Sequence, residues 1–413
     1  MEALHDRCAG LDVHKQTVVA CALWLDSQGH RHHQVQSFGT FTIQLQALGR
    51  WLAEKGVTHV AMESTGVYWK PVFNILEADF EVVPVNARHI KQVPGRKSDV
   101  LDCQWIAQLL QHGLLKASYI PPPAQRQLRD LCRQRAQLTG EHTRIANRIQ
   151  KVLEDANIKL SSVASNVLGV SGRAMLGAIV AGQQDPKALA DLARTQLRNK
   201  IPQLELALSG SVNEHHRYLL EMLLSHLGQL EALIGQLDRR IQRQCRPWAK
   251  ALQRLQQIPG IQQRVAEDLL AEIGPDMSVF PDHTHLASWA GLAPGQRQSG
   301  PRQGSGKPPP GNRWLRRCLT QAAWAASHTR NTYLSARYHR LAGRRGPKRA
   351  VMAVAHTMLV SAYHMLQEGT DYQELGANYF DQLHPQRLAH HLVHRLEHMG
   401  YNVTLQPQET QAM

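Results

Sequence analysis

Residues 8–25 read CAGLDVHKQTVVACALWL, a stretch apolar enough to be buried on both faces. Such a run is typical of an inner strand in a sheet covered by helices. One acidic residue near its start, Asp12, interrupts the apolar pattern. A charge in an apolar strand is costly unless it is paired, hydrogen-bonded or bound to a metal ion. We therefore interpret residues 8–25 as one long buried strand, with Asp12 as a candidate functional residue.

The neighbouring segments alternate between strand and helix periodicity. Strands are predicted at 34–41, 57–65 and 80–86, and helices at 42–56, 67–78 and 98–113. Alternation of this kind predicts an α/β domain, whose sheet is covered by helices. The prolines in YIPPPAQ (119–125) end the pattern, so we predict that this domain comprises residues 1–122.

The rest of the chain is predicted to be mainly helical, with a helical or coiled-coil region at 123–250, a helical domain at 251–368 and an extension at 369–413. Apolar residues follow an unbroken 3-4 spacing at Leu220, Leu223, Leu227, Leu230, Ile234, Leu237 and Ile241. This spacing suggests either a coiled coil, which could join domains or dimerise, or an amphipathic helix packed within its own domain. Residues 255–274 (LQQIPGIQQRVAEDLLAEIG) predict a helical hairpin, which could offer N–H groups to a phosphate or simply serve packing.

Charge is distributed unevenly over the 413 residues, whose formal net charge is +14. Residues 1–120 hold 11 basic and 11 acidic residues, so the whole excess lies beyond them. Residues 296–349 hold 13 Lys and Arg and no acid, interleaved with four large aromatic residues, which favours a folded surface that binds nucleic acid. No apolar run is long enough for a membrane span and the N-terminus lacks the apolar core of a signal peptide, so we expect a cytoplasmic protein without membrane partners.

The six cysteines show no CxxC pairing, which argues against both a disulfide framework and a zinc knuckle. In the extension, His390, His394 and His398 recur four residues apart, with His391 adjacent. No carboxylate or cysteine completes a metal site there. We therefore interpret this helix as a basic surface that faces RNA or a protein partner.

Four carboxylates in the first domain are candidates for a metal site: Asp12, Glu63, Asp99 and Asp102. Glu63 ends a buried strand, and Asp99 and Asp102 would share one face of a helix. Together they offer hard oxygen ligands for Mg²⁺ or Mn²⁺, which could serve phosphoryl transfer. Two simpler interpretations remain open: Asp99 and Asp102 could occupy a first helical turn capped by Ser98, and Asp12 could accept N–H groups at a strand end.

The segment GLDVHK also resembles the phosphate-binding opening of sugar kinases and actin-like ATPases. Those folds need a second glycine-rich phosphate loop and a second similar domain, and the sequence has neither.

The segment GQRQSGPRQGSG (295–306) carries a candidate nucleophile. Ser299 lies among small residues, near Arg297, Arg302 and Lys307. A hydroxyl there could attack a phosphate while the cations stabilise the developing charge. Ser305 has similar surroundings, and the residues alone do not distinguish the two. Further phosphate contacts are expected from the acid-free block, at Arg313, Arg316 and Arg317.

Six segments in this order resemble one family: GLDVHK, AMESTGVYW, RKSDVLDC, IPGI, WAGLAPGQRQSG and GNRWLRRCLTQAAWA. It is the family of DEDD transposases, or recombinases, of the IS110 insertion sequences, and the resemblance spans roughly residues 6–125 and 250–366.

The resemblance implies an RNase H-like first domain, similar to the RuvC resolvases, with its metal-binding tetrad on Asp12, Glu63, Asp99 and Asp102. It implies a nucleophilic serine at Ser299 that forms a covalent phosphoserine link to DNA. Its partners would be donor and target DNA, a structured guide (bridge) RNA and further copies of the chain, as a dimer or tetramer. The chain departs from the family in KPPPGN (307–312), where three prolines stiffen the approach to Gly311.

Overall fold

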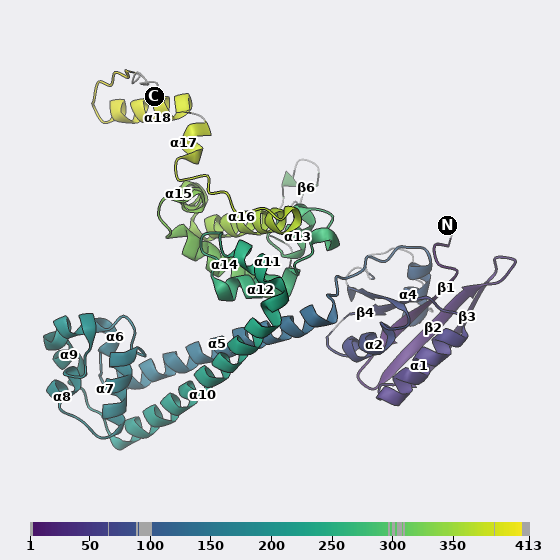
Figure 1. The fold of residues 1–413 in the computed structure, drawn as a ribbon, viewed down its shortest axis with the longest axis horizontal. Coiled ribbons are helices and arrows are strands. Elements are labelled where there is room, and N and C mark those ends of the chain that lie inside the picture. Colours follow the sequence, from purple (N-terminus) through teal and green to yellow (C-terminus); the bar gives the residue numbers. More distant parts are fainter. Residues whose placement is uncertain are drawn as a thin grey trace. The chain divides into compact units, whose positions relative to one another are not determined.

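The structure is a computed structural model that describes residues 3–64, 66–87, 90, 101–295, 298–299, 302–303, 308, 310–383 and 385–406. The chain divides into two compact units, Met1–Ile120 and Pro121–Met413. The first unit is mixed α/β and the second is mostly helical, as the sequence predicts (Figure 1). Within the described residues, no helix is long and apolar enough to cross a membrane.

The first unit is built on a five-stranded sheet of order β3-β2-β1-β4-β5. Its strands are β1 (Arg7–Val13), β2 (Thr17–Leu25), β3 (Arg31–Gly39), β4 (His59–Glu63) and β5 (Glu81–Val85). β2 pairs antiparallel with both β1 and β3, whereas β4 runs parallel to both β1 and β5.

The prediction of one strand over residues 8–25 is wrong. The polar residues His14, Lys15 and Gln16 form a turn between β1 and β2, closed by a hydrogen bond of 2.9 Å from His14 N to Thr17 O. Folding back lets two apolar strands pair with each other, which satisfies their backbone groups and keeps both near the centre of the sheet.

Helices cover both faces of this sheet. Helices α1 (Thr42–Glu54) and α2 (Trp69–Leu76) pack on one face, where Leu48 and Val72 join Leu11 in one buried cluster. Helix α4 (Asp102–Gln111) packs on the other face, where Ile106 joins Cys8 in a second cluster. Alternate residues of each strand therefore point to different helical layers.

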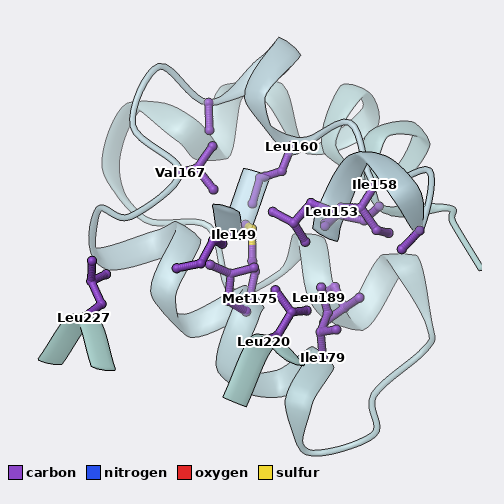
Figure 2. Packing of buried hydrophobic residues seen from close by; sticks show 14 of the residues in the cluster. Ile149, Leu153, Ile158, Leu160, Val167, Met175, Ile179, Leu189, Leu220 and Leu227 are labelled. Carbon is purple, nitrogen blue, oxygen red and sulfur yellow. The ribbon is translucent and has the colours of Figure 1, made fainter. Parts of the chain in front are cut away.

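The second unit begins with two long helices, α5 (Pro123–Asp155) and α10 (Glu214–Cys245), which lie side by side and antiparallel (Figure 1). Short helices between them, packed at one end of the pair, are α6 (Leu160–Val163), α7 (Val170–Val180), α8 (Pro186–Ala190), η1 (Thr195–Lys200) and α9 (Ile201–Leu208). Leu220 and Leu227 of α10 are buried in one cluster with Ile149 and Leu153 of α5 (Figure 2). The 3-4 spacing thus serves packing within the chain, the second of the two alternatives.

The remaining elements form a helical body and a C-terminal extension. They are η2 (Arg246–Trp248), α11 (Ala249–Leu255), α12 (Gln263–Ile273), η3 (Met277–Val279), α13 (His283–Trp289), β6 (Gln298–Ser299), β7 (Arg302–Gln303), α14 (Arg313–Ser327), α15 (Tyr333–Arg345), α16 (Pro347–Glu368), α17 (Tyr379–Leu383) and α18 (Pro385–His398). The predicted hairpin is α11 and α12. Its turn packs on α14, because a Cβ at Gly260 would lie 2.4 Å from the Ala322 carbonyl oxygen.

Candidate functional site

Two of the predicted carboxylates lie at the carboxyl ends of adjacent parallel strands. Leu11 of β1 pairs with Met62 of β4, so the next residues, Asp12 and Glu63, stand level with each other. Asp12 has the same strand parity as Cys8, and Glu63 the same parity as Ala61; both of those residues belong to the α4-side cluster. Since side chains alternate along a strand, both carboxylates point to the α4 face of the sheet.

A close approach of α4 to β1 brings a third carboxylate to this edge. A Cβ on Gly10 would lie 2.2 Å from the Cys103 carbonyl oxygen and 2.4 Å from Ala107 N, so only glycine permits this contact. Asp102 is the first residue of α4, where the positive end of the helix favours an acidic side chain. Burial raises the pKa of the Cys103 thiol to about 11, and the charges of Asp12 and Asp102 add to the rise. Both carboxylates therefore act on the same thiol.

The prediction that Asp99 and Asp102 share one turn of a continuous helix is wrong. Helix α4 begins at Asp102 with Leu101 as its N-cap, and Leu101 is extended (φ −59°, ψ 147°). The two aspartates are therefore not one turn apart on a continuous helix, and Ser98 does not cap α4. Asp99 itself lies outside the described residues.

The donors at this edge suit a hard divalent cation. Asp12 is half-buried. Among the described residues, its Oδ2 contacts His14 Nε2 over 3.1 Å. Carboxylate oxygens are the ligands that Mg²⁺ and Mn²⁺ prefer. Among the residues that the structure describes, no three His, Cys, Asp or Glu side chains stand close enough to hold a metal ion.

The candidate serine lies on a short hairpin in the second unit. Ser299 of β6 pairs with Arg302 of β7 in an antiparallel ladder. Backbone pairing thus joins residues 298–299 to residues 302–303, whereas the sequence predicted only a loop. Three residues assigned to this segment from the sequence, Arg297, Lys307 and the alternative nucleophile Ser305, lie outside the described residues.

Both ends of the segment that carries Ser299 are attached to the C-terminal end of α13. At its start, Ala293 N donates to the Ala287 carbonyl oxygen over 3.2 Å. At its end, Asn312 N donates to the Trp289 carbonyl oxygen over 3.1 Å. Gly311 packs so closely there that a Cβ would lie 2.2 Å from Gly291 N. We call residues 293–312 the serine loop; its two ends are held together by these contacts.

The three arginines predicted on the next helix differ in exposure. Arg313 and Arg317 are exposed one turn apart, whereas Arg316 is half-buried. The Arg313 guanidinium carbon lies 4.9 Å from the centroid of the Trp314 ring, within cation–π range. Arg313 and Arg317 thus present two cations on one face of α14, beside the end of the serine loop.

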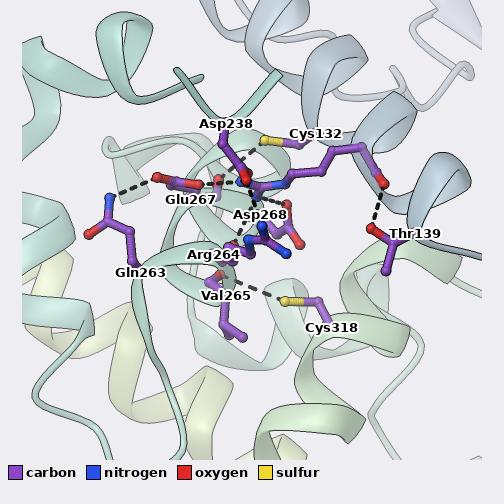
Figure 3. Close-up of polar contacts among 10 residues, drawn as sticks. Cys132, Thr139, Asp238, Gln263, Arg264, Val265, Glu267, Asp268 and Cys318 are labelled. Carbon is purple, nitrogen blue, oxygen red and sulfur yellow. Dashed lines mark hydrogen bonds and ion pairs between the residues drawn. The ribbon is translucent and has the colours of Figure 1, made fainter. Parts of the chain in front are cut away.

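A buried ion network next to α14 was not predicted from the sequence. Arg135 of α5 donates to Glu267 over 2.5 Å, to Asp268 over 2.7 Å and to Asp238 over 3.0 Å (Figure 3). Burial alone would lower the pKa of Arg135, but the charge of Asp268 and the hydrogen bonds to both α12 acids outweigh it and raise that pKa. The sequence signal for this network was Arg135 itself, which lies at a position of α5 where the apolar spacing predicts an apolar residue. Arg135 and Asp268 of this network line a cavity of about 220 Å³ together with Trp314 and Arg317.

Comparisons with known proteins assign both units to one group. Residues 9–158 match a family of transposases, DEDD_Tnp_IS110, and residues 252–339 match the transposase IS116/IS110/IS902 family. An insertion element IS110 uncharacterized 43.6 kDa protein of Streptomyces coelicolor is 36% identical over 124 residues. That alignment spans 29% of this chain and 29% of the relative. The two family matches, in the order that the sequence motifs predict, show that the chain belongs to the IS110 family of transposases.

Proposed function

We propose that the protein is a DNA transposase that cleaves and rejoins strands, with a metal site on Asp12, Glu63, Asp99 and Asp102 and with Ser299 as the nucleophile. One observation supports the proposal: Asp12 and Glu63 lie at the ends of adjacent parallel strands, and α4, which begins with Asp102, packs closely against Gly10 of the first of these strands. The mixed sheet, with helices on both faces, is compatible with an RNase H-like domain of the RuvC kind. The family match over residues 9–158 supports the same proposal.

Mg²⁺ or Mn²⁺ bound by these carboxylates would supply the positive charge that polarises a scissile phosphate. The chain's own contribution is to orient the ligands. Asp12 and Glu63 are fixed by strand pairing, and Asp102 by the contact between Gly10 and α4.

The proposed covalent step is a transesterification. A bond forms between Ser299 Oγ and phosphorus, and the bond from phosphorus to the leaving sugar oxygen breaks. The serine hydroxyl loses its proton, and the leaving sugar oxygen gains one. A phosphodiester is exchanged for a phosphodiester, so a second DNA hydroxyl can reverse the step and join new strands. Arg297 and Arg302 would stabilise the negative charge that develops on the phosphoryl oxygens.

The basic block implies nucleic-acid partners. Lys307, Arg313, Arg316 and Arg317 would contact phosphates of donor and target DNA or of a structured guide RNA. If base pairing with that RNA selects the sequence, the protein needs surfaces that read shape and charge. We further propose that the protein works as a dimer or tetramer in the bacterial cytoplasm. Each chain would consist of four regions, at residues 1–122, 123–250, 251–368 and 369–413.

The histidine-rich helix α18 is proposed to face RNA or a protein partner. None of its residues is buried, and the rings of His394 and His398 stack with centroids 4.9 Å apart. Its function stays a prediction.

The decisive experiment is a search for a serine–nucleotide adduct. The protein is incubated with its own flanking element DNA, guide RNA and Mg²⁺, denatured, digested and analysed by mass spectrometry, with Ser299→Ala as the matched control. We expect an adduct on Ser299 that is absent from the variant. An adduct on Ser305 would keep the mechanism and move the nucleophile.

Two outcomes would replace the proposal. Cleavage without any adduct, unchanged in Ser299→Ala, would indicate a RuvC-like nuclease that uses activated water. Binding without cleavage in any divalent metal would indicate a protein that binds nucleic acid without catalysis.

A further inference from the structure

Glu272 of α12 is a buried carboxylate that the mechanism above does not use. Its side chain is 4% exposed and accepts two hydrogen bonds from Arg133 of α5, from Nε over 2.7 Å and from the terminal nitrogen over 2.8 Å. Arg129 Nε lies 3.3 Å from Glu272 Oε2, the oxygen that the terminal nitrogen of Arg133 also contacts. In this bidentate pairing both carboxylate oxygens act as hydrogen-bond acceptors.

Glu272 also holds the last residue of the serine loop. Asn312 Nδ2 donates to Glu272 Oε2 over 2.6 Å. The Asn312 side-chain oxygen accepts from Trp314 N over 3.0 Å and from Leu315 N over 3.2 Å, which caps α14. One side chain thus joins the end of the loop, the first turn of α14 and the acid on α12.

The chemistry of these groups fixes one orientation of the Asn312 amide. An amide has an accepting end and a donating end, and either end could face α14. Both Glu272 oxygens accept hydrogen bonds from Arg133, so the NH₂ group of Asn312 must face Glu272. The oxygen must then face the N–H groups of α14. Through the two arginines, the same carboxylate ties this arrangement to the long helix α5.

We propose that Glu272 is the positioning residue of the serine loop: it orients Asn312 and thereby sets the end of the segment that carries Ser299 and the start of the helix that carries Arg313 and Arg317. The inference rests on the proposed function of Ser299 as the nucleophile. Glu272 does not touch the reacting atoms in this scheme, and its effect passes through Asn312.

The test compares two buried acids of one helix. Glu272→Gln removes the charge that orders Asn312. Glu267→Gln removes a carboxylate that is equally buried and bonded to Arg135 but has no hydrogen bond to the described residues of the loop. Both variants weaken an ion pair between α5 and α12. Only Glu272→Gln should loosen the serine loop.

Two readouts are measured on each full-length protein. Hydrogen exchange of the free protein should be faster at residues 311–315 in Glu272→Gln than in wild type or Glu267→Gln. Under single-turnover conditions with saturating DNA, the rate of adduct formation on Ser299 should fall about tenfold to a hundredfold in Glu272→Gln, as expected for a nucleophile that is slightly misplaced. DNA affinity should stay within about twofold of wild type, because no phosphate contact is removed.

A reciprocal exchange separates positioning from stability. Asn312→Asp keeps an oxygen that can cap α14 but sets two carboxylates against each other, so the rate should fall. In the double variant, Glu272→Gln with Asn312→Asp, the amide of residue 272 can donate to the new carboxylate and the local charge is restored. We expect recovery of most of the lost rate and of the slow exchange.

The inference is overturned if Glu272→Gln and Glu267→Gln change exchange and rate equally, or if the double variant is no faster than the single ones. If Glu272→Gln does not fold, Asn312→Asp and the double variant decide the question. Absence of an adduct in wild type would refute the nucleophile assignment, and the exchange of the free protein would still decide whether Glu272 orders the loop.

Discussion

Substitution of Gly10 by alanine should separate the carboxylates of the candidate metal site without touching any of them. The new Cβ would lie 2.2 Å from Cys103 O and 2.4 Å from Ala107 N, whereas ordinary contact begins near 3.4 Å. Both neighbours are backbone atoms of α4, so no side chain can rotate away. Helix α4 must therefore move by about 1 Å, and Asp102 moves with it. Overpacking of this kind costs about 1–3 kcal/mol of stability.

Gly49→Ala in α1 is the matched control. Its Cβ would meet only Leu76 Cδ2 at 3.6 Å, an ordinary contact, and alanine in a helix should add up to about 1 kcal/mol of stability. Thermal unfolding is measured with and without Mg²⁺, and strand cleavage is measured on element DNA. We expect Gly10→Ala to lower Tm, to lose the Mg²⁺-induced rise in Tm and to cleave about a hundredfold more slowly. Wild-type stability and cleavage in Gly10→Ala would refute both the close approach of α4 and its part in the site.

Four further predictions follow from the structure. Asp12→Asn should abolish metal-dependent cleavage and leave DNA binding in a gel-shift assay largely intact; normal cleavage would exclude the tetrad. Arg317→Ala should weaken DNA binding and reduce the slope of log K against log salt concentration by about 1, and an unchanged slope would remove this exposed residue from the interface. Leu227→Ala should cost about 2–5 kcal/mol in urea unfolding because the residue is fully buried against α5, whereas Leu233→Ala, at a position that is 45% exposed, should change stability by no more than about 0.5 kcal/mol. Burial raises the pKa of the Cys103 thiol to about 11, so the folded state disfavours the thiolate, and the stability that the thiol contributes is complete below pH 9 and is lost as the pH rises toward 11. Cys103→Ala should lessen this alkaline loss of stability, and identical stability–pH profiles of the two proteins would contradict the raised pKa.

Local patterns in the sequence determined much of the first unit. Apart from β1 and β2, which were predicted as one strand, apolar runs and amphipathic spacing located the strands and helices to within a few residues, because burial on one or both faces leaves a direct signature in the sequence. The position of Glu63 at the end of a buried strand followed from the same patterns, whereas Asp12 was placed near the start of the merged strand. Their common face could also be anticipated, since strand parity and parallel pairing follow from simple geometry.

Contacts between residues far apart in the sequence decided the rest. The turn at residues 14–16 depends on the gain from pairing β1 with β2, which no single strand pattern reveals. The 3-4 spacing of α10 fits a partner helix of any origin, and only the fold places α5 of the same chain against it. The link from Glu272 to Asn312 joins residues 40 positions apart, and a buried acid with its partners leaves no periodic signature. Hydrophobic periodicity records which side of an element is buried, whereas the partner that buries it is chosen by tertiary packing.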